Sequence, residues 1–592
     1  MCGISLWVSS KKIDKEDFKV FNDKVAHRGP DFSKIEIYEC SNKYVALGHR
    51  RLSIIDLKNQ SNQPMHYKSY VLVFNGEIYN YLELKKELEI NGIIFETKSD
   101  TEVLLKSYIF WGEKCLEKFN GMFSFVIFDK DKMQLFFARD RFGIKPLYYF
   151  INNENFYFAS EIKQFTSLKN FQPVGNINCI GNFINNRYLD YSEETFFKNI
   201  FQVRGGEAGF LDIKNLKFNK YRWYDISKSN DKKSESFLEL FKKSIQLRLR
   251  SDVEIGSCLS GGIDSSSIVC VADKEMSKIK KKNYTIQTFT SCFKEKRYDE
   301  RDFVEITKKF TSIKSHYVFP NGNSFFKDIE KIVYYQDEPF PSGSIYAQNC
   351  IFKDASMNGI KVMLDGQGAD ELFCGYSEIF YPTYFKSLTL LKKISEIVNS
   401  SNKKRILKFF LKEIISQNNK KNPSYIKKKY QDKFQNTFDC LKSHIDYFIN
   451  YHLPALLHYE DRNSMRYSIE ARLPFLDYKL VEFGYHTDDY KKIGSGIGKK
   501  IIREALKGIT PDKILNNKLK KGFGTPQRKW IDENKYIIID SIKKLFYFDI
   551  FEESELDTLL FNLKKNIFEE SIVMRIYIFS VWLKVFKINK IV

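Results

Sequence analysis

The chain has 592 residues, 43% of them hydrophobic and 16% aromatic, so we expect about two to four folded domains and exclude a globally disordered chain. No apolar run reaches the roughly 18 residues of a membrane span, and the start lacks the features of a secretory signal, so we expect a cytoplasmic protein without membrane contact. The net charge of +21 is spread along the whole chain, which favours solvated surfaces over a nucleic-acid partner. Ten cysteines without Cys-x-x-Cys spacing argue against a zinc site.

The chain begins Met1-Cys2-Gly3-Ile4. If Met1 is removed, the thiol of Cys2 shares its residue with a free α-amine, so a nucleophile and a base lie on one amino acid. A thiol with a pKa of about 8.5 is partly ionised at pH 7, and an α-amine with a pKa of about 8 can accept its proton. Cys2 is therefore a candidate N-terminal nucleophile, although most N-terminal cysteines have no such role.

The first half of the chain is predicted to be rich in β-strands. Apolar runs at 70–74 and 122–128 have strand length, and the first ends at Asn75-Gly76, which is a turn signal. Further strands fit residues 135–138, 147–150 and 156–159. Mostly short strands with two helices indicate an antiparallel layered domain.

A helix is predicted between these strands, where Asn80 and Glu83 resemble a capping box and helical spacing continues to Leu88. The domain is expected to end before the polar stretch 212–219. We therefore place the first domain at 1–214 and the second at 215–592.

After Tyr224 the pattern changes to alternating helices and strands. Helices are predicted at 235–249, 265–272 and 301–310, and strands at 253–259, 285–292 and 362–364. Such alternation indicates a parallel sheet covered by helices on both faces. Residues 377–451 are rich in lysine with helical periodicity, and we interpret them as a helical insertion.

The strongest chemical signal is Ser260-Gly261-Gly262-Ile263-Asp264-Ser265, which lies between a predicted strand and a predicted helix. Glycines let the backbone approach an anion, and the N–H groups at a helix N-terminus attract phosphate. The Gly-Lys-[Ser/Thr] ending of a Walker loop is missing, and Asp264 is placed to hold a metal ion instead. This segment resembles the pyrophosphate loop of the ATP pyrophosphatases. A second Gly-bearing turn that supplies carboxylates, residues 365–373, agrees with the resemblance.

Motifs along nearly the whole chain extend this resemblance. In the first half they look like class II glutamine amidotransferases, and the complete set resembles the glutamine-hydrolysing asparagine synthetases. The motifs are Cys2-Gly3-Ile4, Ala26-His27-Arg28-Gly29-Pro30-Asp31, Arg51-Leu52-Ser53-Ile54, Phe74-Asn75-Gly76-Glu77-Ile78-Tyr79-Asn80, Ser99-Asp100, Arg139-Asp140-Arg141-Phe142-Gly143, Ser260–Ser265, Tyr467-Ser468-Ile469-Glu470-Ala471-Arg472-Leu473-Pro474-Phe475-Leu476-Asp477 and Lys499-Lys500-Ile501-Ile502-Arg503.

The resemblance implies an α+β N-terminal-nucleophile hydrolase sandwich, with antiparallel sheets between helix layers, followed by an α/β parallel-sheet ATP-pyrophosphatase domain with a helical insertion. Cys2 would attack the carboxamide of glutamine, with its own α-amine moving the proton. Asn75 and the N–H of Gly76 would form the oxyanion hole. Arg51 would hold the α-carboxylate of glutamine with a bidentate fork, and Asp100 with Glu77 would bind near its α-amine.

In the second domain the resemblance implies an ATP site and Mg²⁺. Asp264 and Asp370 would hold the metal ion, and Lys499 would neutralise charge during adenylation and ammonia attack. Ammonia would travel between the two sites through an internal tunnel. The residues expected at ATP are Leu259, Ser260, Gly261, Gly262, Asp264, Ser265, Ser291, Asp365 and Gly366.

Two departures from the family pattern leave the acceptor open. Gln367 stands where relatives tend to carry the glutamate associated with forming the β-aspartyl adenylate. The segment around Ser342 also lacks an arginine that relatives tend to have after an aspartate like Asp337. Aspartate is the first hypothesis, and a sugar acid or a secondary metabolite is the second. A nucleic-acid-binding protein is the alternative from another class, and a homodimer is the oligomeric state to test.

Overall fold

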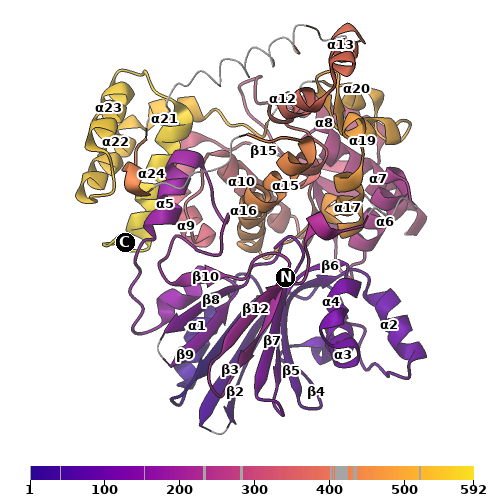
Figure 1. Cartoon of the computed structure of the whole chain (residues 1–592), viewed down its shortest axis with the longest axis vertical. Helices are drawn as coiled ribbons and strands as arrows, with labels where there is room; N and C mark the ends of the chain where they lie inside the picture. Colours follow the sequence, from indigo (N-terminus) through magenta and orange to yellow (C-terminus); the bar gives the residue numbers. More distant parts are fainter. Residues whose placement is uncertain are drawn as a thin grey trace.

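The computed structural model describes residues 2–40, 42–152, 154–230, 235–279, 285–399, 403, 406, 424–430, 437–518 and 522–592. Two antiparallel sheets occupy one end of the molecule, and helices around a parallel sheet occupy the other (Figure 1). Among the described residues no helix is long and apolar enough to cross a membrane.

The first sheet is six-stranded and begins next to the candidate nucleophile. Its central strand β1 pairs antiparallel with β9 on one side and with β3 on the other. In order, the strands are β10 (Ile200–Gln202), β8 (Tyr148–Asn152), β9 (Asn155–Ala159), β1 (Gly3–Ser9), β3 (Lys43–Arg51) and β2 (Phe32–Cys40). On its outer face, Phe18 and Phe21 of α1 (Lys15–Asp23) pack near Tyr157.

The second sheet packs against the first. Alternate side chains such as Leu6, Val73 and Val126 point into the space between the two sheets and are fully buried there. In order, its strands are β12 (Phe218–Arg222), β11 (Glu207–Asp212), β7 (Gln134–Arg139), β6 (Gly121–Asp129), β5 (Tyr70–Ile78) and β4 (Met65–Tyr67). Val103 and Leu104 of α3 (Asp100–Trp111) cover the other face of this sheet. The predicted sandwich of antiparallel sheets between helices is thus confirmed.

Three local expectations in this half are corrected. Asn75 and Gly76 form no turn: they lie inside β5, opposite Ser124 and Phe123 of β6. A Cβ atom at Gly76 would lie 2.2 Å from the carbonyl oxygen of Met122, so glycine is needed for the strands to approach. The polar stretch 212–219 contains the turn of the β11–β12 hairpin, so the boundary expected at residue 214 falls inside a hairpin, and the sheet continues to Arg222.

The capping box expected at Asn80 is not formed. Asn80 is the N-cap of α2 (Tyr81–Ile90), but its side chain donates to the carbonyl of Lys118 and accepts from the N–H of Asn120. Glu83 pairs instead with Arg250 from the second half, with a shortest nitrogen–oxygen distance of 2.6 Å. Long-range partners therefore replace the local pair.

The second half contains the predicted parallel sheet. Its strands, in order, are β15 (Ile313–Val318), β14 (Ile286–Ser291), β13 (Ile255–Cys258), β16 (Val362–Leu364) and β17 (Glu470–Arg472), and each neighbouring pair is parallel. The helices that precede or connect these strands are α6 (Phe237–Arg248), α7 (Ile263–Ile279), α8 (Arg301–Phe310), α9 (Gly322–Gln336), α10 (Ser344–Met357) and α16 (Leu453–Met465). Helix α8 and strand β16 have the predicted bounds.

The segment predicted as an insertion contains the described helices α12 (Ser377–Ser387), α13 (Leu390–Asn399) and α15 (Leu441–Tyr451), whereas residues 424–427 and 437–440 are not helical and Ile426 forms a β-bridge with Phe551. Residues 400–402, 404–405, 407–423 and 431–436 of this prediction lie outside the described residues. The other described elements are α4 (Cys115–Lys118), α5 (Ile177–Asn186), α11 (Ala369–Leu372), α17 (Tyr478–His486), α18 (Asp489–Lys492), β18 (Ile493–Gly494), β19 (Ile497–Gly498), α19 (Lys500–Ala505), α20 (Asp512–Leu515), α21 (Gln527–Glu533), α22 (Lys535–Lys543), α23 (Glu553–Lys564) and α24 (Glu570–Val585).

Buried charges join the two halves. Arg28 donates two hydrogen bonds to Asp461, at 2.7 and 3.0 Å, and a third to Glu161 at 2.7 Å. Lys145 lies 3.3 Å from Asp461, and Lys163 lies 2.9 Å from Asp337. All of these side chains are at most 3% exposed. Such charges are tolerated in the interior only because each has a partner from the other half.

Candidate active sites

Cys2 lies at the entrance of β1, between the two antiparallel sheets and the second half of the chain. It is 7% exposed, its backbone N–H donates to Asn75 Oδ1 at 3.0 Å, and its carbonyl accepts from Arg28 Nε at 3.0 Å. Burial raises the pKa of the Cys2 thiol, while the N–H of Leu52 and the charge of Arg51 act in the opposite direction. Met1 lies outside the described residues.

Asn75 has the geometry of an oxyanion-hole donor. Because its Oδ1 accepts from the Cys2 nitrogen, its Nδ2 is turned elsewhere, and this buried amide nitrogen has no hydrogen-bond partner in the described part of the chain. A buried N–H donor without an acceptor is unfavourable unless a bound ligand supplies the acceptor. Asn75 and Gly76 are consecutive residues of β5, so one strand supplies both predicted donors.

Four of the five residues predicted for glutamine binding line one cavity beside Cys2, and the fifth, Asn75, lies next to it through its hydrogen bond to the Cys2 nitrogen. The lining of this cavity includes Arg51, Gly76, Glu77 and Asp100. Burial raises the pKa of Asp100 to about 6, and burial followed by the charge of Asp100 raises the pKa of Glu77. The N–H of Ile78 donates to Asp100 Oδ2 at 3.0 Å and keeps the carboxyl in place.

Arg51 is held more firmly than the sequence suggests. Its two Nη atoms donate to the carbonyls of Lys58, Ile55 and Asp56 and to Asn62 Oδ1, at distances from 2.5 to 3.3 Å. A guanidinium has five N–H groups, so only Nε–H is left for a ligand. The bidentate grip expected of Arg51 would require displacing these bonds.

Two residues of β17 complete the cavity and were not predicted to do so. Glu470 lines it, and Arg472 lies between Glu470, at 2.6 Å, and Glu77, at 3.6 Å. Their motif was recognised in the sequence, but no sequence signal pairs a strand of the second half with Cys2. The cavity beside Cys2 is therefore built by both halves.

A second and larger cavity, of about 240 Å³, lies at the carboxyl ends of the parallel strands. All residues expected at ATP line it, together with Gln367, Asp370 and Lys499: Leu259, Ser260, Gly261, Gly262, Asp264, Ser265, Ser291, Asp365 and Gly366. Its further lining includes Arg503, from the motif that begins at Lys499, and Gln348 and Lys518, which the sequence did not single out.

The loop between β13 and α7 has the shape that the glycine pattern predicted. Gly261 has φ +74°, and a Cβ atom there would lie 2.6 Å from the Cβ of Phe303. The Ser260 N–H donates to Ser265 Oγ at 3.2 Å, which folds the loop over the start of α7. The helix N-terminus therefore faces the cavity, where it would attract phosphate.

Lys499 bridges the two predicted metal ligands. Its Nζ lies 2.5 Å from Asp264 Oδ2 and 2.5 Å from Asp370 Oδ1. Burial lowers the pKa of Lys499, and the carboxylates of Asp264 and Glu371 oppose that effect. Asp264 Oδ1 is buried with no hydrogen-bond partner among the described residues. The carboxylates of Asp264 and Asp370 thus converge on one positive charge, that of Lys499. Such carboxylate oxygens are the ligands that Mg²⁺ prefers.

Gln367 is backed by a buried carboxyl group. Its Nε2 lies 3.5 Å from Glu460 Oε2, which also accepts from Gln348. Glu460 is 2% exposed, and burial followed by the charge of Asp365 raises its pKa. The segment around Ser342 is held by a hydrogen bond that the Gly343 N–H donates to the side chain of Gln527.

Helix α16 links the two cavities. Glu460 reaches toward the larger cavity through Gln367, while the next residue, Asp461, pairs with Arg28, which holds the carbonyl of Cys2. Two consecutive residues of α16, Glu460 and Asp461, are thus connected by hydrogen bonds to residues at the two candidate sites.

Comparison with known proteins agrees with this division. Residues 1–224 match the family model described as glutamine amidotransferase domain, and residues 236–577 match the one described as asparagine synthase. The chain is 31% identical over 568 residues to "Asparagine synthetase [glutamine-hydrolyzing] 1" of Bacillus subtilis, covering 88% of this chain and 85% of that protein. It is 34% identical over 406 residues to "Putative asparagine synthetase [glutamine-hydrolyzing] 2" of Methanocaldococcus jannaschii, covering 64% and 76%. "Amidase chyE" of Penicillium rubens is 26% identical, with 90% and 89% covered.

Proposed function

Because the chain belongs to the family of glutamine-hydrolysing asparagine synthetases, we propose that it transfers the amide nitrogen of glutamine to the side-chain carboxylate of aspartate, using ATP. The observation that carries the proposal is one chain with two cavities, one around Cys2 and one around the loop 260–265, joined by α16. In support of the proposal, Cys2, Arg51, Glu77 and Asp100 line the first cavity, and Asp264, Asp370 and Lys499 line the second.

In the first half-reaction, Cys2 attacks the carboxamide carbon of glutamine after Met1 has been removed. Its α-amine takes the thiol proton and passes a proton to the leaving ammonia, and water then hydrolyses the thioester to glutamate. The free Nδ2 of Asn75 and the N–H of Gly76 would stabilise the tetrahedral oxyanion. Asp100 and Glu77 would bind the α-ammonium group of glutamine.

In the second half-reaction, the aspartate β-carboxylate attacks the α-phosphorus of ATP, which gives β-aspartyl-AMP and pyrophosphate. The loop 260–265 would cradle the phosphates at the N-terminus of α7. Asp264 and Asp370 would hold Mg²⁺, which neutralises phosphate charge when bound. Lys499, already between these carboxylates, would place its positive charge where negative charge develops, and ammonia would then displace AMP to give asparagine.

Ammonia would pass from one cavity to the other inside the protein. Arg28 and Asp461, which join the two halves beside Cys2, are buried, and we expect them to keep bulk water away from the path of ammonia. Exclusion of water keeps ammonia unprotonated and therefore nucleophilic.

A second candidate function uses the same machinery on another carboxylate, such as a sugar acid or a secondary metabolite. It is favoured by Gln367, which provides an amide where relatives tend to carry a carboxylate, and by the segment around Ser342, which lacks the arginine. A relative with the name of an amidase is similar over most of this chain.

The test is release of pyrophosphate and AMP by the purified protein with glutamine, ATP and Mg²⁺. Aspartate should stimulate release, and asparagine should form in equal amount. If aspartate leaves release at background while another acid raises it, the second function holds. Cys2→Ala should abolish activity with glutamine and retain activity with ammonium salts, and an intact mass should show that Met1 is absent.

A further inference from the structure

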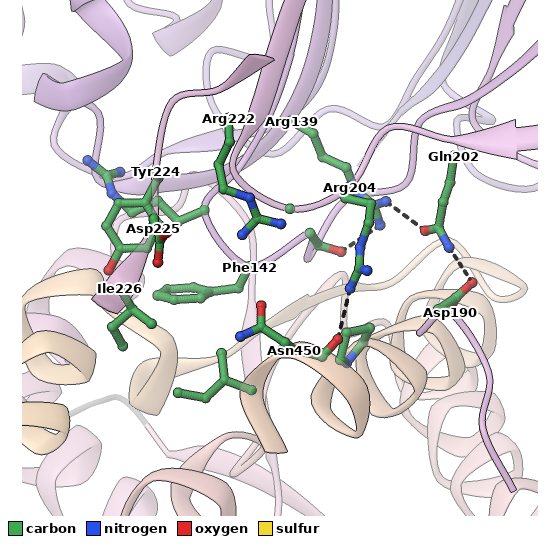
Figure 2. Close-up of a pocket in the computed structure, with 15 residues that line it drawn as sticks. Arg139, Phe142, Asp190, Gln202, Arg204, Arg222, Tyr224, Asp225, Ile226 and Asn450 are labelled. Atoms are coloured by element: carbon green, nitrogen blue, oxygen red, sulfur yellow. Dashed lines mark hydrogen bonds between the residues drawn. The ribbon is translucent and has the colours of Figure 1, made fainter. Parts of the chain in front are cut away.

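A third polar cavity lies at the junction of the two halves, and Figure 2 shows its lining. It shares no lining residue with the cavity around Cys2 or with the ATP cavity. The loop after β7, the segment before β11 and the end of β12 form three of its sides. Asn450 of α15 and Pro454 of α16 close it from the second half.

Four arginines line this cavity, and no ion pair to any of them is present in the described part of the chain. Two of the four donate mainly to oxygen atoms of the backbone and of Gln202, although the buried Nε of Arg141 has no partner among the described residues. Arg139 donates to the carbonyls of Lys145 and Gly143, and Arg141 to the carbonyls of Phe119 and Glu117. Both of these side chains serve the fold.

The acidic residues of the lining are also engaged. Asp190 accepts from His458 at 2.7 Å and from Gln202 at 2.9 Å. Asp225 accepts from the N–H and the hydroxyl of Ser227. Neither carboxylate therefore neutralises the remaining two arginines by a direct contact.

Those two arginines, Arg204 and Arg222, point from the first half toward Asn450 (Figure 2). Arg204 donates to the carbonyls of Tyr191 and Asn450, which leaves three of its five N–H groups. Arg222 is exposed and has no hydrogen bond to any described residue. Burial, followed by the charge of Arg222, lowers the pKa of Arg204, so the two cations repel each other at close range.

We propose that this cavity binds a small oxyanion, of which inorganic phosphate is the simplest example, between Arg204 and Arg222. Guanidinium groups suit tetrahedral oxyanions because their planar N–H forks donate in pairs. The free volume of about 40 Å³ holds a few water molecules, so an ion of phosphate size fits and a nucleotide does not. The bound anion would remove the repulsion between the two cations.

The position of the site gives the binding a consequence. Arg222 ends β12 of the first half, and Arg204 is already bonded to Asn450 of the second half. An anion held by both arginines would tie the last strand of the first domain to α15. The anion would thus act as a bridge that strengthens the junction, independently of which acceptor the enzyme amidates.

The test is calorimetric titration of the full-length protein with phosphate at constant ionic strength, with chloride as the replaced anion. The ATP cavity is first filled with a non-hydrolysable ATP analogue and Mg²⁺, because its loop also attracts phosphate. Wild-type protein should bind one phosphate. Arg222→Gln should weaken binding about tenfold or more, since it removes a charge-assisted fork, and Arg204→Gln with Arg222→Gln should abolish it.

Arg528→Gln, on α21, is the matched control and should bind phosphate as wild type does. Arg222 makes no bond in the described structure, so its variant is not expected to disturb folding, and unchanged glutamine hydrolysis would verify this. Absence of binding to wild-type protein, or equal binding by the double variant, would overturn the proposal. A melting temperature that rises with phosphate in wild type but not in Arg222→Gln would support the bridge.

Discussion

At the scale of single residues, buried ionisable groups connect stability with binding. Asp100 is 5% exposed and has a pKa near 6, whereas an aspartate in an unfolded chain titrates near 4. Between about pH 4 and 6 the folded state therefore binds more protons than the unfolded state, so this residue lowers stability as the pH rises through that window. At neutral pH the charged Asp100 side chain therefore lowers the stability of the fold, and we propose that this charge serves to bind glutamine.

Asp100→Asn should therefore stabilise the protein at pH 7 by about 3 kcal/mol, the free energy that corresponds to a pKa raised from about 4 to about 6. The same variant should weaken glutamine binding. The amide oxygen can still accept from the N–H of Ile78. Denaturant unfolding at pH 4 and pH 7 should show the gain only at the higher pH, while KM for glutamine rises. A variant that is less stable than wild type at pH 7 would contradict this.

Lys499 should be indispensable for the synthetase reaction. Lys499→Met removes the cation between Asp264 and Asp370, which leaves two half-buried carboxylates facing each other. Pyrophosphate release should fall by about two orders of magnitude or more, whereas glutamine hydrolysis should persist. Lys500→Met is the neighbouring control, because Lys500 only donates to the carbonyl of Tyr490, and it should behave as wild type.

At the scale of elements, the turn between α11 and α12 sets the shape of the ATP cavity. A Cβ atom at Gly375 would lie 1.7 Å from Asp370 Oδ1 and 2.4 Å from Lys499 Cε. Gly375→Ala should therefore separate these two side chains and reduce pyrophosphate release at least tenfold, about 1.4 kcal/mol of activation free energy. Glutamine hydrolysis in the same sample serves as the internal control, since Gly375 does not line the cavity around Cys2.

Elements also show what the sequence can predict. Regular alternation gave α8 and β16 with their observed bounds, and the loop 260–265 was predicted because strand, glycines and helix are contiguous. The edge strands β15 and β17 were missed because polar and charged residues interrupt their apolar pattern, whereas the equally short β16 is wholly apolar. Asn75-Gly76 was misread because a close approach between strands requires glycine as much as a turn does.

The same limit applies to the sites. Most residues expected from contiguous motifs line the expected cavities, whereas Glu470 lies about 470 residues along the chain from Cys2 and Glu460 is 93 residues from its partner Gln367. The state of Arg51 was equally unpredictable, because its partners are backbone carbonyls, which carry no sequence signature.

At the scale of the whole molecule, the junction depends on Asp461. Asp461→Asn leaves Arg28 and Lys145 without their shared anion in a buried place, so we expect a loss of about 3–5 kcal/mol in the free energy of unfolding. We also expect more glutamate formed per pyrophosphate, because the region between the cavities loosens. Denaturant unfolding and the ratio of the two products measure both effects.

The control is an exposed pair that also joins the halves. Lys361 and Asp31 lie 3.2 Å apart with side chains 41% and 29% exposed, and such pairs contribute about 0–1 kcal/mol. Lys361→Gln should leave both the stability and the product ratio near wild type. Equal effects of the two variants would show that burial of the junction charges is unimportant.

Glu470, on the wall of the cavity around Cys2, also makes the order of synthesis matter. A ribosome completes residues 1–224 long before it reaches Asp461 and Glu470, and domains generally fold as they emerge. Until then Arg28 faces water and the wall beside the nucleophile is absent. If the proposed function holds, glutamine hydrolysis would have to await the translation of about as many residues again.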